Sequence, residues 1–382
     1  MDRTLQALFA LLQAGLWGRY DDAAASVFPL SAEEWERVFT LARQQTVTGI
    51  AFRGLDFLPE EAAPPMVLTA KWMVHADRVE QSNRVMNEAV AKLYGHFASA
   101  GVEAVLQKGQ GVDAMYPEPL LRECGDIDLY FPGYDGVSDP LAGIPGAVRK
   151  RQPDNSWSYV LDGIVVEHHA DLVDIQSPRA KRYVRKLIGD KGVEKVVTGD
   201  GVEVLVPAPE VNLLLLSSHI LKHAFGVGIG LRQFCDYAVA RRYYEGRVNE
   251  EEMREIWKKA GLVKWQGLLE GFLRRFLDSD CVLARNDSEN VQGDSHSEQH
   301  HCHSERSEES FDDKKTDVLL DIVLKGGNFG VYSKDRKNVS HARWVRKMQT
   351  FRSLTGNARF AFRYAPREWF WTIVQLLGGQ FR

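Results

Sequence analysis

The feature that most constrains the fold is a short run of alternating side chains that carries two acidic residues. In Asp126-Ile-Asp-Leu-Tyr-Phe131 polar and apolar residues alternate, and Pro132-Gly133 follows directly. Successive side chains of a β-strand point to opposite faces of a sheet, so Asp126 and Asp128 are predicted to project from the same face. The run therefore predicts a strand that presents two neighbouring carboxylates.

Further strands are predicted on both sides of this run. Their segments are rich in Val, Ile, Leu and Tyr and comprise residues 102–106, 159–161, 164–168 and 202–206. Asp162-Gly163 is the strongest short hairpin signal in the chain, because it combines turn residues with apolar segments on either side. The turn Lys108-Gly-Gln-Gly111 follows the first strand and is expected to lead into a short helix that reaches about Tyr116.

The first hundred residues show helical patterns. The segment from Leu5 to Trp17 predicts an amphipathic helix rather than a signal peptide. Ser31 with Glu34 forms the pattern of a capping box, and the helix that it starts is expected to extend to about Phe52. Apolar residues then recur at helical spacing over residues 66–100 and stop at Gly101.

Together these patterns predict an α+β protein with a helical N-terminal region, a small mixed-sheet core and a helical C-terminal region. Residues 279–316 are dominated by Ser, Glu, Asp and His, and a segment with so few apolar residues is expected to be disordered. The predicted regions are 1–100 (helical), 101–207 (sheet core), 208–278 (helices packed on the core), 279–316 (disordered insert) and 317–382 (basic, aromatic helical tail).

The tail has an unusual charge. Between Ser333 and Arg382 there are 11 Lys or Arg residues and two acidic residues, with Trp and Phe side chains between them. Such a segment suits a polyanion or a membrane surface. The alternative is a pair of helices that packs its aromatic side chains on the core while the arginines face water.

The bulk composition limits the classes of function. The formal net charge of −4 gives the whole chain no attraction to nucleic acid, which is not the favoured partner. The four cysteines form no CxxC pair, so reduced thiols and a cytoplasmic location are predicted. No segment has the uninterrupted apolar length of a transmembrane helix.

The carboxylates predict a metal site. Two aspartates on one face of a strand offer hard oxygen ligands, which suit Mg²⁺ or Mn²⁺. Glu167 lies between apolar neighbours on a later predicted strand, where an acidic side chain needs a partner, and a metal is one such partner. The competing interpretation of Asp126 and Asp128 is the polar face of a surface strand.

A resemblance to a known family supports the first interpretation. The motifs resemble the signature of bacterial uncharacterised nucleotidyltransferases of the DNA polymerase β-like superfamily. The residues that carry it are Lys108-Gly109, Ala114-Met-Tyr116, Pro119, Arg122, Gly125-Asp-Ile-Asp-Leu129 and Glu167-His-His169, with a helical continuation from Pro207 through His219, His223, Gly230-Leu-Arg-Gln and Asp236. The third carboxylate is Glu here where Asp is commoner, and Lys-Gly replaces the superfamily's usual Gly-Gly or Gly-Ser.

The resemblance implies that Asp126, Asp128 and Glu167 are catalytic and hold Mg²⁺ or Mn²⁺ against a nucleoside triphosphate. Lys108 and Gly109 are then expected to contact phosphate, although Lys108 also suits an exposed turn. Arg122 is expected to contact phosphate or to pair with Asp126 or Asp128.

The histidines leave several interpretations open. His169 is expected to orient a carboxylate or the nucleotide, or to pack beside its strand. His219 and His223 are four residues apart on one helix, a spacing that suits zinc, substrate contact or packing against the sheet.

The expected reaction is the transfer of a nucleoside monophosphate from a triphosphate to an unknown hydroxyl or phosphate acceptor. One alternative is a regulatory module that binds a nucleotide or a protein without turnover. Another is an antitoxin-like nucleotidyltransferase that modifies a partner protein.

Overall fold

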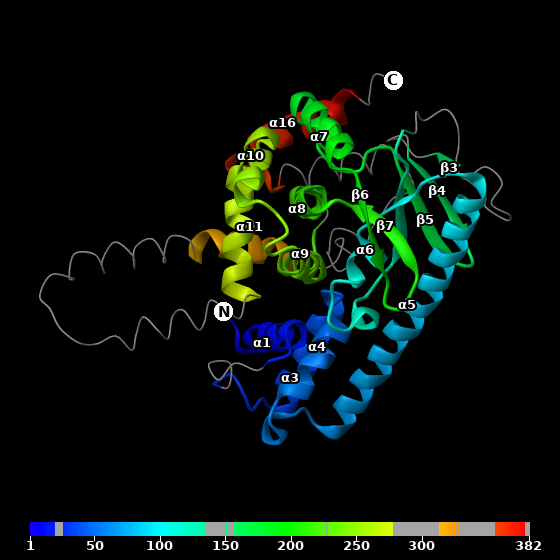
Figure 1. The fold of residues 1–382 in the computed structure, drawn as a ribbon. Helices are drawn as coiled ribbons and strands as arrows, with labels where there is room; N and C mark the ends of the chain where they lie inside the picture. The colour runs from blue at the N-terminus through cyan, green and yellow to red at the C-terminus, as the bar shows by residue number, and fades with distance from the viewer. Residues whose placement is uncertain are drawn as a thin grey trace, which may run out of the picture.

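The computed structural model of the protein describes residues 1–19, 26–133, 150–151, 156–226, 228–277, 313–325, 327 and 356–378, with residues 150–151 described by their backbone alone. Helices surround a central mixed sheet, with the N-terminal helices at one end and the C-terminal helices at the other (Figure 1). The predicted α+β class is confirmed. The region boundaries expected from the sequence stay a prediction.

The sheet has seven strands in the order β3-β4-β5-β2-β1-β7-β6. Their bounds are β1 Val105–Gln107, β2 Asp126–Tyr130, β3 Lys150–Arg151, β4 Trp157–Leu161, β5 Ile164–His169, β6 Val193–Val197 and β7 Glu203–Pro207. The pairs β2–β5 and β1–β7 are parallel, and the remaining pairs are antiparallel.

All five predicted strands are present, although β1 begins at Val105 rather than at Val102. The hairpin at Asp162-Gly163 is confirmed, since both residues have positive φ angles, of 51° and 84°, and join β4 to β5. The strands β3 and β6 were not predicted. Both lie at the edges of the sheet, and in β6 the buried side of the strand is limited to Val196, so its sequence lacks a clear apolar alternation.

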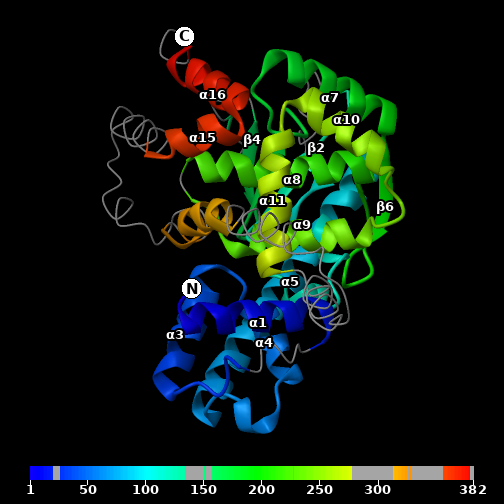
Figure 2. The ribbon, with the colours of Figure 1, turned by 90° about the vertical axis from the view of Figure 1, so that its left-hand side faces the viewer.

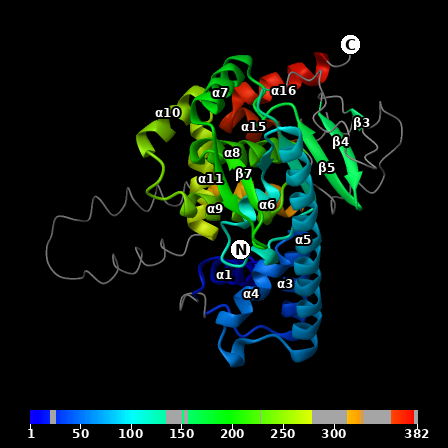
Figure 3. The same ribbon diagram turned by 45° about the vertical axis from the view of Figure 1, so that its right-hand side comes forward.

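One long helix, α5 (Met66–Ala100), connects the N-terminal helices to the sheet (Figure 3). Its first part carries Trp72, which packs in the N-terminal core with Trp35 and Phe39. Its second part carries Val90 and Leu93, which are buried against one face of the sheet. The helix thus belongs to both hydrophobic cores.

The N-terminal helices α1 (Arg3–Trp17), α3 (Ala32–Gln44) and α4 (Thr48–Gly54) pack around the start of α5. The capping box of Ser31 and Glu34 is confirmed. The expected continuous helix to about Phe52 is wrong, because Thr46 has a positive φ angle of 52° and separates α3 from α4. The predicted amphipathic character of α1 is confirmed, since Arg3, Gln6, Gln13 and Trp17 share its less buried side and the rest of the helix is buried.

Helix α4 holds the segment that leads into β2. The backbone N–H of Thr48 donates to Glu123 Oε1 at 2.7 Å, and the indole of Trp72 donates to the Thr48 carbonyl oxygen at 2.9 Å. A Cβ atom at Gly49 would lie 2.2 Å from the carbonyl oxygen of Leu121. The close packing of α4 on this segment therefore requires glycine at position 49.

The other face of the sheet is covered by helices that follow β5 in the chain (Figure 2). They are α7 (Pro178–Lys191), α8 (Pro209–Phe225), α9 (Leu231–Tyr243), α10 (Glu250–Ala260) and α11 (Val263–Phe276). Four short helical elements lie earlier in the chain, namely η1 (Leu55–Phe57), η2 (Glu60–Ala62), α6 (Gly109–Asp113) and η3 (Pro119–Leu121). Most of the predicted insert lies outside the described residues. Its last part, residues 313–316, is instead the beginning of a helix over residues 313–325.

The C-terminal segment forms α15 (Ala358–Tyr364) and α16 (Pro366–Gly378). Phe360 is buried and meets Trp265 of α11 edge to face, with ring centroids 6.2 Å apart. Phe362 and Phe370 are exposed. The expected helical pair is therefore confirmed for the described part of the tail, although only some of its aromatic side chains pack on the core. No helix in the described part of the chain combines the length and apolar character that a membrane crossing requires.

Two glycine substitutions test the packing of α4. Gly49→Ala should destabilise the protein by about 1–3 kcal/mol, since the new methyl group meets backbone that cannot rotate away. The control is Gly95→Ala in α5, where a Cβ atom has nothing within 4 Å; it should stabilise the protein by up to about 1 kcal/mol through helix propensity. Urea denaturation measures the change in the free energy of unfolding for both variants. A change of the same sign in both would contradict the close packing of α4 at Gly49.

Candidate active site

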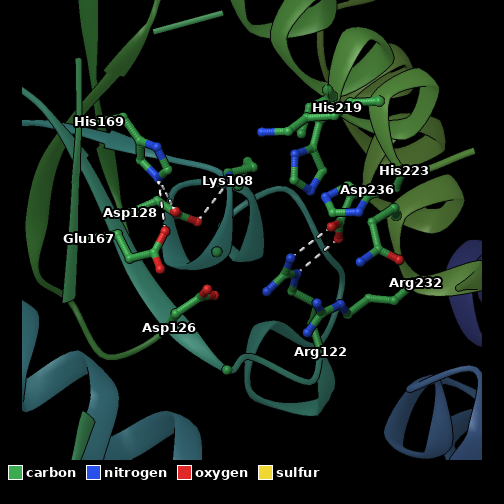
Figure 4. A pocket seen from close by; sticks show the side chains of 15 residues that line it. Lys108, Arg122, Asp126, Asp128, Glu167, His169, His219, His223, Arg232 and Asp236 are labelled. Atoms are coloured by element: carbon green, nitrogen blue, oxygen red, sulfur yellow. Dashed lines mark hydrogen bonds and ion pairs between the residues drawn. The ribbon is translucent and has the colours of Figure 1, made fainter. Parts of the chain in front are cut away.

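A pocket of about 210 Å³ lies between the sheet and helices α8 and α9. Acidic side chains from β2 and β5 line one side, and basic side chains and histidines from α8 and α9 face them (Figure 4). The lining residues are Lys108, Gly109, Arg122, Gly125, Asp126, Asp128, Glu167, His169, Leu216, His219, Lys222, His223, Arg232, Gln233 and Asp236. All the site residues predicted from the sequence are in this set.

Strand pairing brings the three carboxylates together. In the parallel pair β2–β5, Asp128 lies opposite Glu167, and Asp126 lies opposite Val165. The alternate residues Ile127 and Leu129 are buried in the core on the other face of the sheet. The predicted common face of Asp126 and Asp128 is thus confirmed, and the surface-strand alternative is wrong for Asp128, which is 5% exposed.

Asp128 is held by two basic partners. Lys108 Nζ lies 3.0 Å from its Oδ2 atom, and His169 Nε2 lies 2.5 Å from its Oδ1 atom. Burial alone would raise the pKa of Asp128, but the charge of Lys108 and the hydrogen bond to His169 lower that pKa well below its ordinary value. Asp128 is therefore ionised at neutral pH, and His169 orients this carboxylate.

The neighbouring carboxylates show the opposite effect. Burial, and then the charge of Asp128, raise the pKa values of both Asp126 and Glu167. Negative charge is therefore concentrated in the pocket, which favours the binding of a cation. In the described part of the chain, one group of side chains could bring three ligand atoms within 4.8 Å of one another, namely Asp128, Glu167 and His169.

The turn after β1 directs Lys108 into the pocket. Lys108 and Gly109 have positive φ angles of 50° and 44°, a conformation that is unusual for a lysine. The Lys108 side chain is 14% exposed, so the exposed-turn alternative is wrong. Burial lowers the pKa of Lys108, but the charges of Asp128 and Asp126 raise it by more than burial lowers it. The net pKa is therefore above the ordinary value, and the ammonium is charged.

Arg122 pairs with neither Asp126 nor Asp128, the two partners that the sequence suggested. Its guanidinium donates to both carboxylate oxygens of Asp236 in α9, at 2.9 and 2.7 Å, and the Tyr116 hydroxyl donates to the same carboxylate at 2.7 Å. Pairing with Asp126 or Asp128 is therefore wrong. The buried Arg122–Asp236 pair joins the segment before β2 to α9.

The helical side of the pocket carries four residues that we call the basic wall: His219, Lys222 and His223 of α8 and Arg232 of α9. Sequence reasoning gave no role to Lys222 and Arg232. Lys222 Nζ lies 3.0 Å from Asp174 Oδ2, and Asp174 also forms a hydrogen bond with His219. Burial and the charge of Lys108 lower the pKa of His219 to about 4, so its ring is neutral at pH 7.

Sequence signals for the wall were weak. Arg232 lies in Gly230-Leu-Arg-Gln, which carried the family resemblance, while Lys222 looks like an ordinary helix lysine until the fold places it beside Asp174. The rings of His219 and His223 pack edge to face, with centroids 4.5 Å apart. Neither belongs to the three-residue metal group found in the described residues, so the zinc interpretation gains no support.

Comparison with protein families identifies the family of the chain. A family model described as "uncharacterised nucleotidyltransferase" matches residues 31–278. The chain belongs to this family. The matched range includes both sides of the pocket, whereas α15 and α16 lie beyond it. A search of the curated proteins and a search of the solved structures each found no match.

Asp236→Asn tests the buried ion pair. The substitution leaves the Arg122 guanidinium buried without its carboxylate, so we expect a loss of about 3–5 kcal/mol in the free energy of unfolding. The control Asp162→Asn removes the exposed pair with Lys92 and should cost at most about 1 kcal/mol. Urea denaturation at pH 7 measures both.

The same pair has a pH dependence. Burial opposes the ionisation of Asp236, but Arg122 lowers its pKa below the ordinary value of 3.8. The stabilisation is therefore complete above that value and is lost as the pH falls through the lower pKa of the folded state. The difference in the free energy of unfolding between the wild type and Asp236→Asn should therefore shrink in acid. A difference that grows in acid would contradict the stabilising role of this ion pair.

Proposed function

We propose that this protein is a metal-dependent nucleotidyltransferase, which moves a nucleoside monophosphate from a nucleoside triphosphate to a hydroxyl or phosphate acceptor and releases pyrophosphate. The observation that carries the proposal is that Asp126, Asp128 and Glu167 line one pocket from two adjacent parallel strands, opposite the basic wall. Membership of a nucleotidyltransferase family supports this reaction class.

The donor set fits Mg²⁺ or Mn²⁺. Asp126, Asp128 and Glu167 would supply carboxylate oxygens, and His169 offers a nitrogen close to two of them. Hard divalent ions prefer such oxygen ligands and keep further positions for water and phosphate. When bound, they would neutralise phosphate charge and make the acceptor hydroxyl easier to deprotonate.

The other pocket residues suit a triphosphate. Lys108 is a buried point charge beside the carboxylates, and the turn at Gly109 brings backbone close to β2. Lys222 and Arg232 add charge from the opposite side. The pocket is smaller than the roughly 300–1,000 Å³ of pockets that enclose drug-sized ligands. We therefore place the phosphates inside the pocket and the nucleoside at its mouth.

The remaining residues position these groups. His169 holds the Asp128 carboxylate, and Arg122, which is fixed by Asp236, lines the phosphate side of the pocket. The succession of strand, glycine turn, helix, paired aspartates and later acidic strand supports placement in the DNA polymerase β-like superfamily. The free thiols of Cys124 and Cys235 support a reducing, cytoplasmic location.

Glu167→Gln separates an enzyme from a binding module. Asp126 and Asp128 remain in this variant, so much of the affinity for magnesium with ATP should be retained. Transfer should fall by two or more orders of magnitude, because an interaction that is made mainly in the transition state affects rate more than binding. Calorimetry measures the affinity, and label transfer from radioactive triphosphates to components of a cell lysate measures the rate.

The matched control is Glu203→Gln, which changes an exposed glutamate of β7 that pairs with Lys195. It should alter neither affinity nor transfer. Equal transfer by Glu167→Gln and the wild type would exclude Glu167 from catalysis. A wild type that binds the nucleotide tightly but transfers nothing would support the regulatory-module alternative instead.

A further inference from the structure

The C-terminal helical pair contacts two backbone segments that carry part of the basic wall. In α16, the carboxylate of Glu368 accepts hydrogen bonds from the backbone N–H groups of Gln176, at 2.6 Å, and Ser177, at 3.2 Å. At the start of α15, the side-chain amide of Asn357 donates to the carbonyl oxygen of Ala224 at 3.0 Å. Figures 1 and 2 show α16 at the end of the molecule where α7 lies.

The two contacted segments meet at one ion pair of the wall. Gln176 follows Asp174 by two residues, and Ala224 follows Lys222 by two residues. Asp174 and Lys222 form an ion pair at 3.0 Å, and Asp174 also forms the hydrogen bond with His219. The tail therefore fixes the chain next to both partners of the interaction that holds Lys222 and His219.

The Glu368 contact is specific. Glu368 is 4% exposed, and burial of an acidic group is unfavourable unless hydrogen bonds compensate for the lost water. Burial raises the pKa of Glu368, while the backbone N–H groups of Gln176 and Ser177 oppose that rise. The N-cap residue of α7, Ser177, makes no side-chain cap, so Glu368 supplies the acceptor at this helix end.

The contacted segment between β5 and α7 has no regular structure of its own. Residues 170–177 form neither helix nor strand, although they carry Asp174. Lys222 is 49% exposed and has a long side chain, so its position depends on Asp174. An ordered partner reduces the entropy that such a side chain loses when it binds a ligand.

We propose that α15 and α16 form a brace for the basic wall and that Glu368 is a positioning residue for triphosphate binding. This inference depends on the function proposed above, because that function gives the wall its ligand. The brace lies outside the range matched by the family model, which ends at residue 278. A part of the chain beyond the nucleotidyltransferase region thus sets the geometry of its pocket.

The test compares three folded variants with the wild type. Glu368→Ala should weaken the affinity for magnesium with ATP roughly tenfold and increase hydrogen exchange in residues 170–177 and 219–225. Glu368→Gln should restore affinity to within about twofold, because its carbonyl oxygen still accepts the two backbone N–H groups. Glu34→Ala removes a capping carboxylate far from the pocket and should lower the melting temperature without changing affinity.

Calorimetry at a temperature well below all melting temperatures gives the affinities, and mass spectrometry gives the exchange. If Glu368→Ala does not fold, Asn357→Ala removes the other contact and should show the same two effects. Unchanged affinity and exchange in the folded variant would overturn the brace. If the wild type does not bind magnesium with ATP, the proposed function is contradicted, and exchange in the two segments alone decides whether α16 fixes them.

Discussion

The interaction on which the site depends is the one that keeps Asp128 charged inside the protein. Three carboxylates share one face of two neighbouring strands, and their mutual repulsion is unfavourable, most of all at the buried Asp128. Lys108 and His169 compensate for this at Asp128, which occupies the middle position. At Asp126 and Glu167, burial and the charge of Asp128 raise the pKa values and outweigh Lys108 and His169, which also act there and lower both values. The site therefore retains a net attraction for a cation.

The surrounding fold serves to bring two oppositely charged surfaces together. The sheet supplies the acidic side, and α8 and α9 supply the basic wall. The buried pair of Arg122 and Asp236 connects the two, because one partner precedes β2 and the other lies in α9. A triphosphate with its metal carries both signs of charge, so it matches this arrangement better than a simple cation or a simple anion does.

Local patterns in the sequence predicted the parts of the fold that are determined by residues close together in the chain. The strand of Asp126 and Asp128, the turn at Asp162-Gly163 and the capping box at Ser31 each depend on neighbouring residues only, and all three are present. The partner of Arg122 lies 114 residues away, and no local pattern could select Asp236 over Asp126 or Asp128.

The same limit applies to the wall and to its brace. Lys222 gains its place in the pocket from the packing of α8 on the sheet, and its ion pair with Asp174 spans 48 residues. Glu368 accepts its hydrogen bond from Gln176 across 192 residues of the chain. The family resemblance implied that Glu167 joins Asp126 and Asp128, but the register that places Glu167 opposite Asp128 came only from the structure.

The most direct measurement of the central claim is a crystal structure of the protein with Mn²⁺ and a non-hydrolysable ATP analogue, recorded with anomalous scattering from manganese. The account predicts anomalous density within bonding distance of the Asp126, Asp128 and Glu167 carboxylates, with the phosphates of the analogue between that density and the basic wall. Anomalous density at another place, or bound analogue without any density at these carboxylates, would contradict it.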